Sequence, residues 1–478
     1  MTGVVLRPYQ NDVLSDLKFG IDQGARSPCL QMPTGSGKSP VGARLAKYWV
    51  QMGGTVWTLV HRRELAKQWL SHLQNDGVPA IDGSAGISSF NALVWGVALL
   101  RGRLDTMPMP DPDKLLIITD EGHHAPAPTY QAVYDASQPR INLLLTATPA
   151  RTDGKGLAPT ADYLVEGPDV ASLIAVGALS DYEILSLPGG PDTTGIRRSK
   201  GDWVKGQLAE RCQTVTANVV GAWKRYARGR NNLVFAVNRD HGRKLASELS
   251  NAGGDVRYVD GTTPERQRDI IMDGFKAGEF TELVTVDLIG EGFDCEGADC
   301  AILARPTQSV VVHLQQIGRT LRPGLRKALI VDTVGNTNRL GGPRTPRRWS
   351  LDGRVESDLS EGDKPFEGGI LCEKCGTRSP SGSTQCVACG KAFAKGGSKR
   401  EIDTKLVTID ELSIEIKGNG NGGWDRRSVQ KAMRRCRNWS DLRRLAQQLG
   451  YSRRWAELQA EYRPHLAESA DVMNGGRR

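Results

Sequence analysis

Short apolar runs bounded by polar turns alternate with longer amphipathic segments through the first part of the chain. Apolar runs at residues 55–61, 115–120 and 141–146 have the length and composition of buried strands. Residues 8–23 and 62–75 carry apolar positions at helical spacing between such runs. Strands that alternate with helices form βαβ units, so we predict a doubly wound parallel sheet in residues 1–175.

The same alternation repeats after residue 232. Five further runs predict strands, and helices are predicted at residues 239–252 and 264–277. The predicted strands are residues 233–237, 256–259, 283–286, 301–304 and 328–331. We therefore expect a second parallel-sheet domain over residues 176–340 and an α/β fold class for the chain, with the connection between the domains at its start.

The composition changes after this second domain. Residues 341–368 are rich in Gly, Pro, Arg and acidic residues, which favours a linker. A small cysteine module follows at residues 369–394. Residues 400–478 form a tail that we expect to be mainly helical.

A glycine-rich segment follows the apolar run at residues 28–32 and precedes a predicted helix at residues 41–50. Strand, glycine-rich turn and helix together are the context of a phosphate-binding loop. Gly35 and Gly37 let backbone N–H groups face an anion, Lys38 reaches the β- and γ-phosphates, and the Ser39 hydroxyl holds Mg²⁺. The residues expected to hold the nucleotide here are Pro33, Thr34, Gly35, Ser36, Gly37, Lys38 and Ser39. Met32 stands where the usual first glycine is found.

Adjacent carboxylates end the apolar run at residues 115–120. The carboxyl ends of parallel strands form the edge where ligands bind, so Asp120 is expected to help hold Mg²⁺. Glu121 is expected to orient and deprotonate the attacking water. A surface Asp-Glu pair after a strand is common, and the phosphate-binding loop upstream is what favours the catalytic interpretation.

The order of these segments resembles superfamily 2 helicases and translocases of the DExH kind, closest to restriction-enzyme res subunits and XPB-like proteins. The resemblance covers residues 7–334, and it implies ATP as the nucleotide and two tandem RecA-like domains. The matching segments are 7–10 (entrance segment), 35–39 (motif I), 60–65 (Ia), 120–123 (II), 146–148 (III), 234–236 (IV), 285–294 (V) and 315–323 (VI). Gly122 stands where alanine is commoner in motif II.

The resemblance also assigns roles to individual residues. Gln10, with Arg7, reads the adenine base, and motif VI supplies Gln315 and the arginine fingers Arg319 and Arg322. Motif V adds two nucleotide contacts, Gly292 and Asp294. The residues expected to contact nucleic acid are His61, Arg62, Arg63, Thr146, Thr148 and Thr285.

The formal net charge of +9 favours an anionic partner, and nucleic acid is the first candidate. From residue 424 to 478 the tail has 13 Lys and Arg against six Asp and Glu, interleaved with aromatic residues. Arg434 and Arg435 are expected to contact nucleic acid there. A small helical domain with buried tryptophans and a charged exterior is the alternative interpretation.

Four cysteines form a C-x₂-C-x₁₀-C-x₂-C pattern: Cys372, Cys375, Cys386 and Cys389. Two such pairs are typical of a structural Zn²⁺ site, because four thiolates leave no open position for catalysis. Disulfides are the alternative, and the expected cytoplasmic location disfavours them. The module either contacts nucleic acid or acts only as a structural staple.

The sequence therefore predicts an ATP-dependent DNA helicase or translocase with Mg²⁺ and Zn²⁺, and no membrane segment. The alternatives are an RNA helicase of the same fold, a motor subunit of a restriction or defence complex that translocates without unwinding, and a non-hydrolysing nucleic-acid-binding protein. The predicted helicase or translocase could also have protein partners in a repair, replication or defence complex. An E-x-K segment at residues 415–417 also fits a nuclease, but alternating apolar residues explain it as a strand edge.

Overall fold

The computed structural model describes residues 4–353, apart from 86–90, 152, 154, 187–190, 192, 194, 200–201, 213–214, 289–296 and 325. It also describes four strand segments beyond that range, at residues 356–357, 370–371, 378–379 and 407–408. The cysteines of the predicted zinc module and nearly all of the basic tail lie outside the described residues. Across the described residues, no helix combines the length and the apolar content needed to cross a bilayer.

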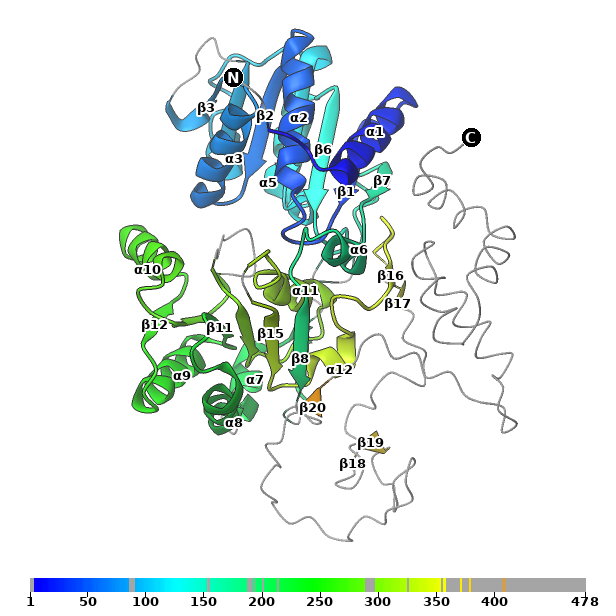
Figure 1. Ribbon diagram of the computed structural model, residues 1–478. Coiled ribbons are helices and arrows are strands. Elements are labelled where there is room, and N and C mark those ends of the chain that lie inside the picture. The colour runs from blue at the N-terminus through cyan, green and yellow to red at the C-terminus, as the bar shows by residue number, and fades with distance from the viewer. Residues whose placement is uncertain are drawn as a thin grey trace, which may run out of the picture. The chain divides into compact units, whose positions relative to one another are not determined.

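The first domain contains a seven-stranded parallel sheet in the order β3-β4-β2-β5-β6-β1-β7. Its strands are β1 (Pro28–Gln31), β2 (Thr55–Val60), β3 (Ala80–Asp82), β4 (Ala92–Gly96), β5 (Leu115–Asp120), β6 (Ile141–Thr146) and β7 (Tyr163–Glu166). Its helices are α1 (Pro8–Asp22), α2 (Lys38–Gln51), α3 (Arg63–Asn75), α4 (Val97–Arg101) and α5 (Pro128–Ser137). Figure 1 shows α1, α2 and α3 beside the blue and cyan strands of this sheet.

The second domain contains another seven-stranded sheet, in the order β12-β13-β11-β14-β15-β8-β20. All of its pairs are parallel except the pair of β20 with β8, which is antiparallel. Its strands are β8 (Tyr182–Ser186), β11 (Asn232–Phe235), β12 (Val256–Val259), β13 (Glu282–Thr285), β14 (Cys300–Leu303), β15 (Ala328–Asp332) and β20 (Val407–Thr408). Its helices are α7 (Lys205–Cys212), α8 (Val215–Ala222), α9 (Arg239–Asn251), α10 (Glu265–Ala277), α11 (Val310–Gly318) and α12 (Asn336–Leu340), and α6 (Val170–Ala175) precedes β8. The predicted pair of parallel-sheet α/β domains is confirmed.

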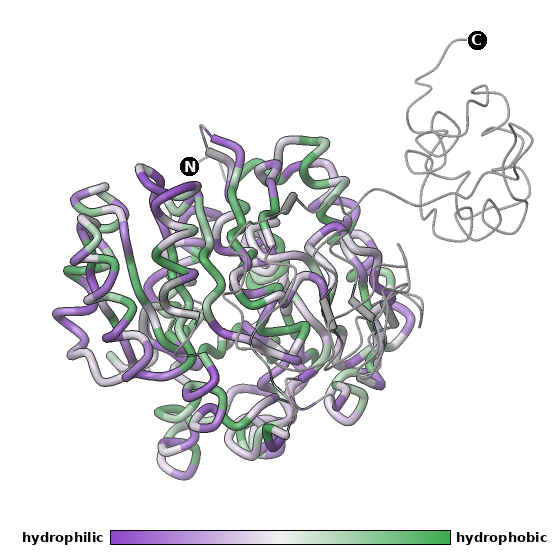
Figure 2. Tube along the Cα trace, turned by 90° about the horizontal axis from the view of Figure 1, so that it is seen from below, coloured by the Kyte–Doolittle hydropathy of each residue, from purple (hydrophilic) through white to green (hydrophobic). Residues whose placement is uncertain are grey.

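Buried side chains cover both faces of each sheet. Strands β5 and β6 are buried at every position, as expected for central strands covered on both sides. Three core clusters result, of which two belong to the first domain and one to the second. The outer helices carry hydrophobic and hydrophilic residues along their lengths, which is typical of amphipathic helices packed on a sheet (Figure 2).

The first part of the segment expected as a linker is ordered and packed. Arg347 is buried and donates to the carbonyl oxygens of Gly342, Thr345 and Leu340. Further on, the Leu351 carbonyl accepts the N–H groups of Leu157 and Ala158 in the first domain. Residues 341–353, which we call the strap, therefore connect the end of the second domain back to the first.

Candidate functional site

The loop between β1 and α2 has the backbone that a phosphate-binding loop needs. Gly35 and Gly37 have φ values of 83° and 88°, in the left-handed region that other residues rarely adopt. Gly37 is the N-cap of α2, so the helix N-terminus opens toward the loop. The Lys38 ammonium group donates to the carbonyl oxygens of Met32 and Pro33, at 3.0 and 3.3 Å, and so lies over its own loop.

The start of α1 contacts this loop directly. The Gln10 amide donates to the Gly37 carbonyl at 3.0 Å, and the Tyr9 hydroxyl donates to the Ser36 carbonyl at 2.8 Å. A Cβ atom at Gly37 would lie 2.3 Å from the Gln10 amide nitrogen, so a larger residue there would displace the Gln10 side chain. The entrance segment and the glycine-rich loop therefore form one packed unit, although 27 residues separate Gln10 from Gly37.

Both carboxylate oxygens of Asp120, at the end of β5, have hydrogen-bond donors. One accepts from the Trp69 indole at 2.9 Å, and the other accepts from the Glu121 N–H at 3.0 Å. Burial raises the pKa of Asp120, as does the charge of Glu121, whereas the Trp69 hydrogen bond and Lys38 lower it. The backbone of Glu121, directly after β5, has a φ of 50°, in the left-handed region that residues other than glycine rarely adopt.

Motif VI lies close to the glycine-rich loop of the other domain. A Cβ atom at Gly318, the last residue of α11, would lie 2.7 Å from Thr34 Cβ. A Cβ atom at Gly35 would lie 3.8 Å from Arg322 Cγ. The close approach of α11 to the loop thus depends on glycine at position 318.

The charges of both domains act on Lys38. Burial lowers the pKa of Lys38 most, Glu121 and Asp120 raise it, and Arg319 and Arg322 lower it further. The two arginines are therefore within electrostatic reach of the lysine ammonium group. Arg319 is itself buried, with 5% of its surface exposed.

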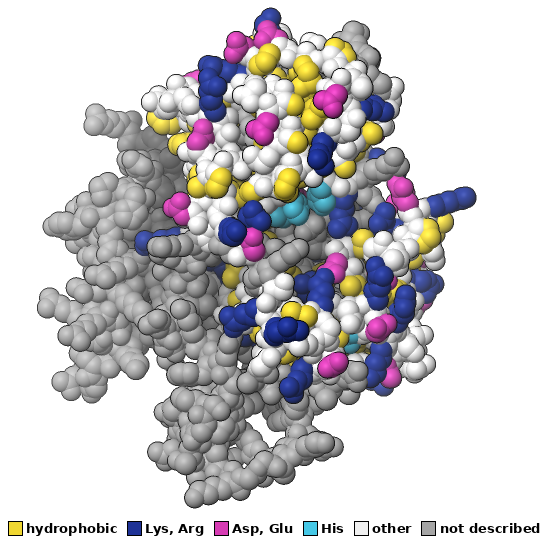
Figure 3. All heavy atoms as spheres, turned by 180° about the vertical axis from the view of Figure 1, so that it is seen from behind, with side chains coloured by type: hydrophobic (Ala, Val, Ile, Leu, Met, Phe, Trp, Pro, Cys, Tyr) yellow, Lys and Arg dark blue, Asp and Glu magenta, His cyan; other side chains and the backbone are white. Residues whose placement is uncertain are grey.

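A row of histidine rings extends from the catalytic edge toward motif Ia. His123 lies 3.5 Å from the Glu121 carboxylate and 3.3 Å from the Thr146 hydroxyl. Its ring centroid is 4.3 Å from that of His124, which in turn is 5.0 Å from that of His61. Histidine side chains also gather beside Lys and Arg side chains on the face drawn in Figure 3.

Arg62 extends this row to the second domain. Its Nε donates to His61 Nε2 at 3.2 Å, and its Nη1 donates to the Leu288 carbonyl at 3.2 Å. Leu288 lies just after β13, in the segment that resembles motif V. Side chains therefore link the carboxylate pair to motif Ia and motif V.

The other residues predicted to contact nucleic acid lie deeper. Thr146, Thr148 and Thr285 are at most 1% exposed, and the Thr146 hydroxyl donates to the Thr148 carbonyl. Their contact with a strand stays a prediction. The predicted site residues that lie outside the described residues are Gly292, Asp294, Arg434, Arg435, Cys372, Cys375, Cys386 and Cys389, and the Arg63 side chain is likewise not described.

The residues present fit a magnesium nucleotide. The left-handed backbone at Gly35 and Gly37 suits a loop whose N–H groups face an anion, and Lys38 supplies positive charge beside it. Ser39 and Asp120 offer oxygen ligands, which Mg²⁺ prefers. Among the described residues there is no group of three or more His, Cys, Asp or Glu that could hold a metal ion by itself.

Sequence reasoning missed several residues that shape the site. Trp69 has the spacing of an ordinary core residue on α3, and no motif indicates that its indole holds Asp120. Tyr9 lies inside the entrance segment at residues 7–10, so its position next to Gln10 could have indicated that it contacts the glycine-rich loop. His124 directly follows motif II, but its ring contact with His61 depends on the approach of distant segments.

Comparison with known proteins gives two matching family models. The model described as type III restriction enzyme, res subunit, matches residues 3–151. The model described as helicase conserved C-terminal domain matches residues 213–324. Together the two models span most of both sheet domains.

Several curated proteins are similar over much of the chain. A "51.5 kDa protein" of Lactococcus phage (isolate 7-9) is 34% identical over 394 residues, which cover 81% of this chain and 83% of the phage protein. The Schizosaccharomyces pombe protein named mitochondrial ATP-dependent helicase irc3 is 30% identical over 354 residues, covering 70% of this chain and 58% of that protein. The DNA 3'-5' helicase XPB of Kineococcus radiotolerans is 26% identical over 346 residues, covering 67% and 58%. The chain thus spans less than two thirds of the length of the last two relatives.

Solved structures share the fold. A fragment of an HsdR subunit of a type I restriction enzyme from Vibrio vulnificus has a TM-score of 0.56 at 19% identity, covering 74% of this chain and 68% of that one. The type ISP restriction-modification enzyme LlaBIII bound to DNA has a TM-score of 0.52 at 15% identity, covering 70% of this chain and 28% of that one. At these identities the likeness concerns the fold.

Proposed function

We propose that this chain, which belongs to superfamily 2 of ATP-dependent helicases and translocases, uses ATP hydrolysis to move along DNA. Within the superfamily it belongs to the group of restriction-enzyme res subunits and XPB-like proteins, and it is a nucleic-acid-dependent ATPase. The observation that carries the proposal is the approach of motif VI to the glycine-rich loop, with Gly318 against Thr34 and both arginines within electrostatic reach of Lys38. One nucleotide site then takes residues from both domains.

Each side chain has a proposed task. Lys38 neutralises the β- and γ-phosphates, Ser39 and Asp120 hold Mg²⁺, and Glu121 takes a proton from the attacking water. When bound, the metal ion supplies charge neutralisation on the phosphate oxygens. Asp120 is already held by two hydrogen bonds, so its carboxylate needs little reorganisation.

The two arginines of motif VI have a different proposed task. Arg319 and Arg322 come from the second domain and neutralise charge that develops on the transferred phosphoryl group. Adenine selection falls to Gln10, whose amide lies beside Gly37. Closure of the two domains on the nucleotide would then be coupled to strand movement through Arg62, which already donates to Leu288.

DNA is proposed as the strand. The support is the net charge of +9 and the names of the relatives, which include a DNA helicase and a DNA-bound restriction enzyme. Backbone contacts by arginines are sequence-independent and salt-sensitive. An RNA helicase of the same fold has weaker support.

A motor subunit that translocates without separating strands is a second candidate. It is favoured by the match of the res-subunit model to residues 3–151. Displacement of a triplex-forming strand without unwinding of a forked duplex would indicate this activity.

The central experiment is ATP turnover with single-stranded, duplex and forked DNA and with RNA of matched length. We expect stimulation by DNA over RNA, and loss of stimulated turnover by a factor of at least about 10² in Lys38→Ala, because the lysine charge is part of phosphate binding. Lys18→Ala on α1 is the control. It also removes a lysine, but this lysine lies over the Tyr48 ring and not at the phosphate-binding loop. Unchanged turnover in Lys38→Ala would contradict the assignment of the site.

Two further assignments rest on the sequence. We propose that Cys372, Cys375, Cys386 and Cys389 hold one structural Zn²⁺, and elemental analysis of the purified chain that finds no zinc would overturn this. We also propose a cytoplasmic location, supported by Cys29, Cys212 and Cys300, which are buried free thiols.

A further inference from the structure

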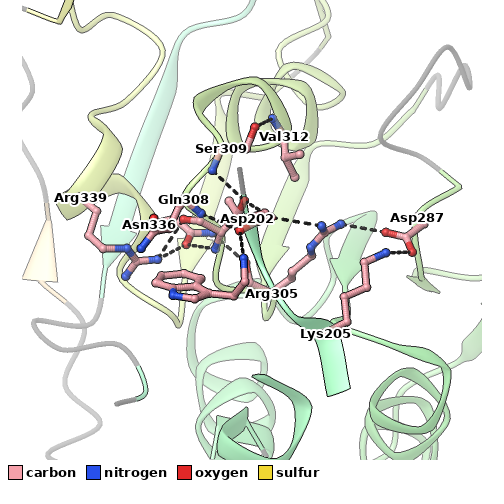
Figure 4. A network of polar contacts seen from close by, with 11 residues as sticks. Asp202, Lys205, Asp287, Arg305, Gln308, Ser309, Val312, Asn336 and Arg339 are labelled. Atoms are coloured by element: carbon pink, nitrogen blue, oxygen red, sulfur yellow. Dashed lines mark hydrogen bonds and ion pairs between the residues drawn. The ribbon is translucent and has the colours of Figure 1, made fainter. Parts of the chain in front are cut away.

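A short hairpin in the second domain carries a carboxylate that holds the start of the motif VI helix. The hairpin pairs β9 (Arg198–Ser199) with β10 (Asp202–Trp203) and lies between β8 and α7. One oxygen of Asp202 accepts the Gln308 N–H at 2.9 Å, and the other accepts the Thr307 hydroxyl at 2.7 Å (Figure 4). The hairpin thus binds both backbone and side chain of the loop that leads from β14 into α11.

Asn336, the first residue of α12, binds the same loop. Its side-chain NH₂ donates to the Arg305 carbonyl at 2.9 Å, and its oxygen accepts the Thr307 N–H at 3.0 Å. Ser309 then caps α11 by accepting the Val312 N–H at 3.4 Å. The start of α11 is therefore fixed by side chains from two other elements.

Arg305 connects this arrangement to the segment after β13. Its guanidinium group donates to the Asp287 carboxylate at 2.8 Å and to Asp202 at 3.4 Å, and 12% of the side chain is exposed. Asp287 has a φ of 57° and also pairs with Lys205. A residue other than glycine keeps such a backbone only when its surroundings hold it there.

We propose that Asp202 and Arg305 are positioning residues for ATP hydrolysis, which orient α11 so that Arg319 and Arg322 face the phosphate-binding loop. This inference rests on the proposed function, because it uses the role of the two arginines there. No motif covers Asp202, and Arg305 lies outside motifs V and VI.

The geometry explains how residues at one end of a helix control groups at the other. Helix α11 has nine residues, so a change in its direction at Ser309 displaces its last turn as a rigid unit. A displacement of about 1 Å can cost up to about 10² in rate at a catalytic group. Arg319 is the C-cap of α11, so it moves with the helix.

A positioning role predicts a specific kinetic effect. The arginines act on charge that develops in the transition state, so their displacement lowers kcat and leaves the KM for ATP nearly unchanged. In Asp202→Asn, one oxygen still accepts from Gln308, but the amide nitrogen cannot accept from Thr307 or Arg305. In Arg305→Lys, a single ammonium group replaces a planar fork that bridges two carboxylates.

Asp299 provides the matched control. It lies just before β14, at the opposite end of the strand that leads to Arg305, and it accepts the Asn231 N–H at 2.9 Å. Its side chain is 21% exposed, against 16% for Asp202. Asp299→Asn removes a similar charge from the same domain without touching the loop before α11.

The experiment measures kcat and KM for DNA-stimulated ATP hydrolysis by the full chain, with thermal unfolding of each variant. We expect kcat to fall about 10- to 100-fold in Asp202→Asn, less in Arg305→Lys, and less than 2-fold in Asp299→Asn, with KM within 3-fold of wild type throughout. The double variant Asp202→Asn/Arg305→Lys is expected to lose no more than the worse single variant, because both changes release the same helix.

Three outcomes decide the matter. Equal losses of kcat in Asp202→Asn and Asp299→Asn would indicate general destabilisation and overturn the inference. A kcat within 2-fold of wild type in Asp202→Asn, together with an inactive Arg319→Ala, would overturn the inference alone. Full activity in Arg319→Ala would overturn the proposed function and the inference together.

Discussion

At the scale of single residues, the site depends on neighbours that hold the functional groups in one orientation. Asp120 receives hydrogen bonds on both oxygens, from Trp69 and from the backbone of Glu121. The Gln10 amide similarly has both its oxygen and its nitrogen engaged, by the Arg7 N–H and the Gly37 carbonyl. Side chains held in this way cost little to reorganise when a substrate arrives.

A buried histidine predicts how stability changes with pH. His241 Nδ1 accepts the Val237 N–H at 3.2 Å, so it carries no proton, and burial lowers the pKa of His241 to about 4. Between pH 6.5 and pH 4 the unfolded chain binds a proton that the folded chain does not, so stability falls as the pH falls. We expect His241 to make the protein about 2 kcal/mol less stable at pH 5 than at pH 7.5.

Chemical denaturation of wild type and His241→Gln at both pH values tests this. The variant should lose less stability on acidification than wild type, although it starts from a lower value because it disturbs the hydrogen bond to Val237. Identical slopes for wild type and His241→Gln would show that His241 does not titrate as described.

At the scale of elements, the strap connects the two domains by backbone contact. Residues Leu157 and Ala158 both donate to the Leu351 carbonyl, at 2.7 and 2.8 Å. A Cβ atom at Gly156 would lie 1.9 Å from the same oxygen, so only glycine lets the strap approach. On the other side, Arg344 of the strap donates its N–H to the Tyr182 hydroxyl at 3.0 Å.

Gly156→Ala should therefore detach the strap from the first domain. We expect a loss of about 1–3 kcal/mol, because the added methyl group would overlap backbone that cannot move aside cheaply, and faster trypsin cleavage after Arg347 and Arg348. Gly206→Ala in α7 is the matched control, since nothing lies within 4 Å of its added Cβ atom, and it should be neutral or slightly stabilising. Equal trypsin sensitivity of Gly156→Ala and wild type would contradict the contact.

The elements themselves follow closely from the hydrophobic pattern. Strands β5 and β6 have the predicted bounds, because each is a continuous apolar run between turns. The β9–β10 hairpin has two residues in each strand, too few to give a periodic signal, and it was not predicted. The strap was expected to be a linker because its composition is that of one, and its order comes from contacts with two distant segments.

At the scale of the whole molecule, the proposed site requires residues far apart in the sequence. The sequence motifs indicated which residues to consider, since Lys38, Glu121 and Arg319 each lie in a motif that has a known role in one family. They did not indicate Trp69, Asp202 or Arg305, whose roles depend on which segments meet. Such contacts are set by tertiary packing, and a single sequence carries no local pattern for them.

The proposed ATP site takes residues from both domains. The most direct measurement is the single-turnover rate of hydrolysis of pre-bound ATP by Arg319→Ala/Arg322→Ala with saturating single-stranded DNA. We predict a rate at least about 10³-fold below wild type with nucleotide affinity within 3-fold, because the arginines act on the transition state and Lys38 still holds the phosphates. A rate within 2-fold of wild type would show that the second domain supplies nothing to hydrolysis and would contradict the account.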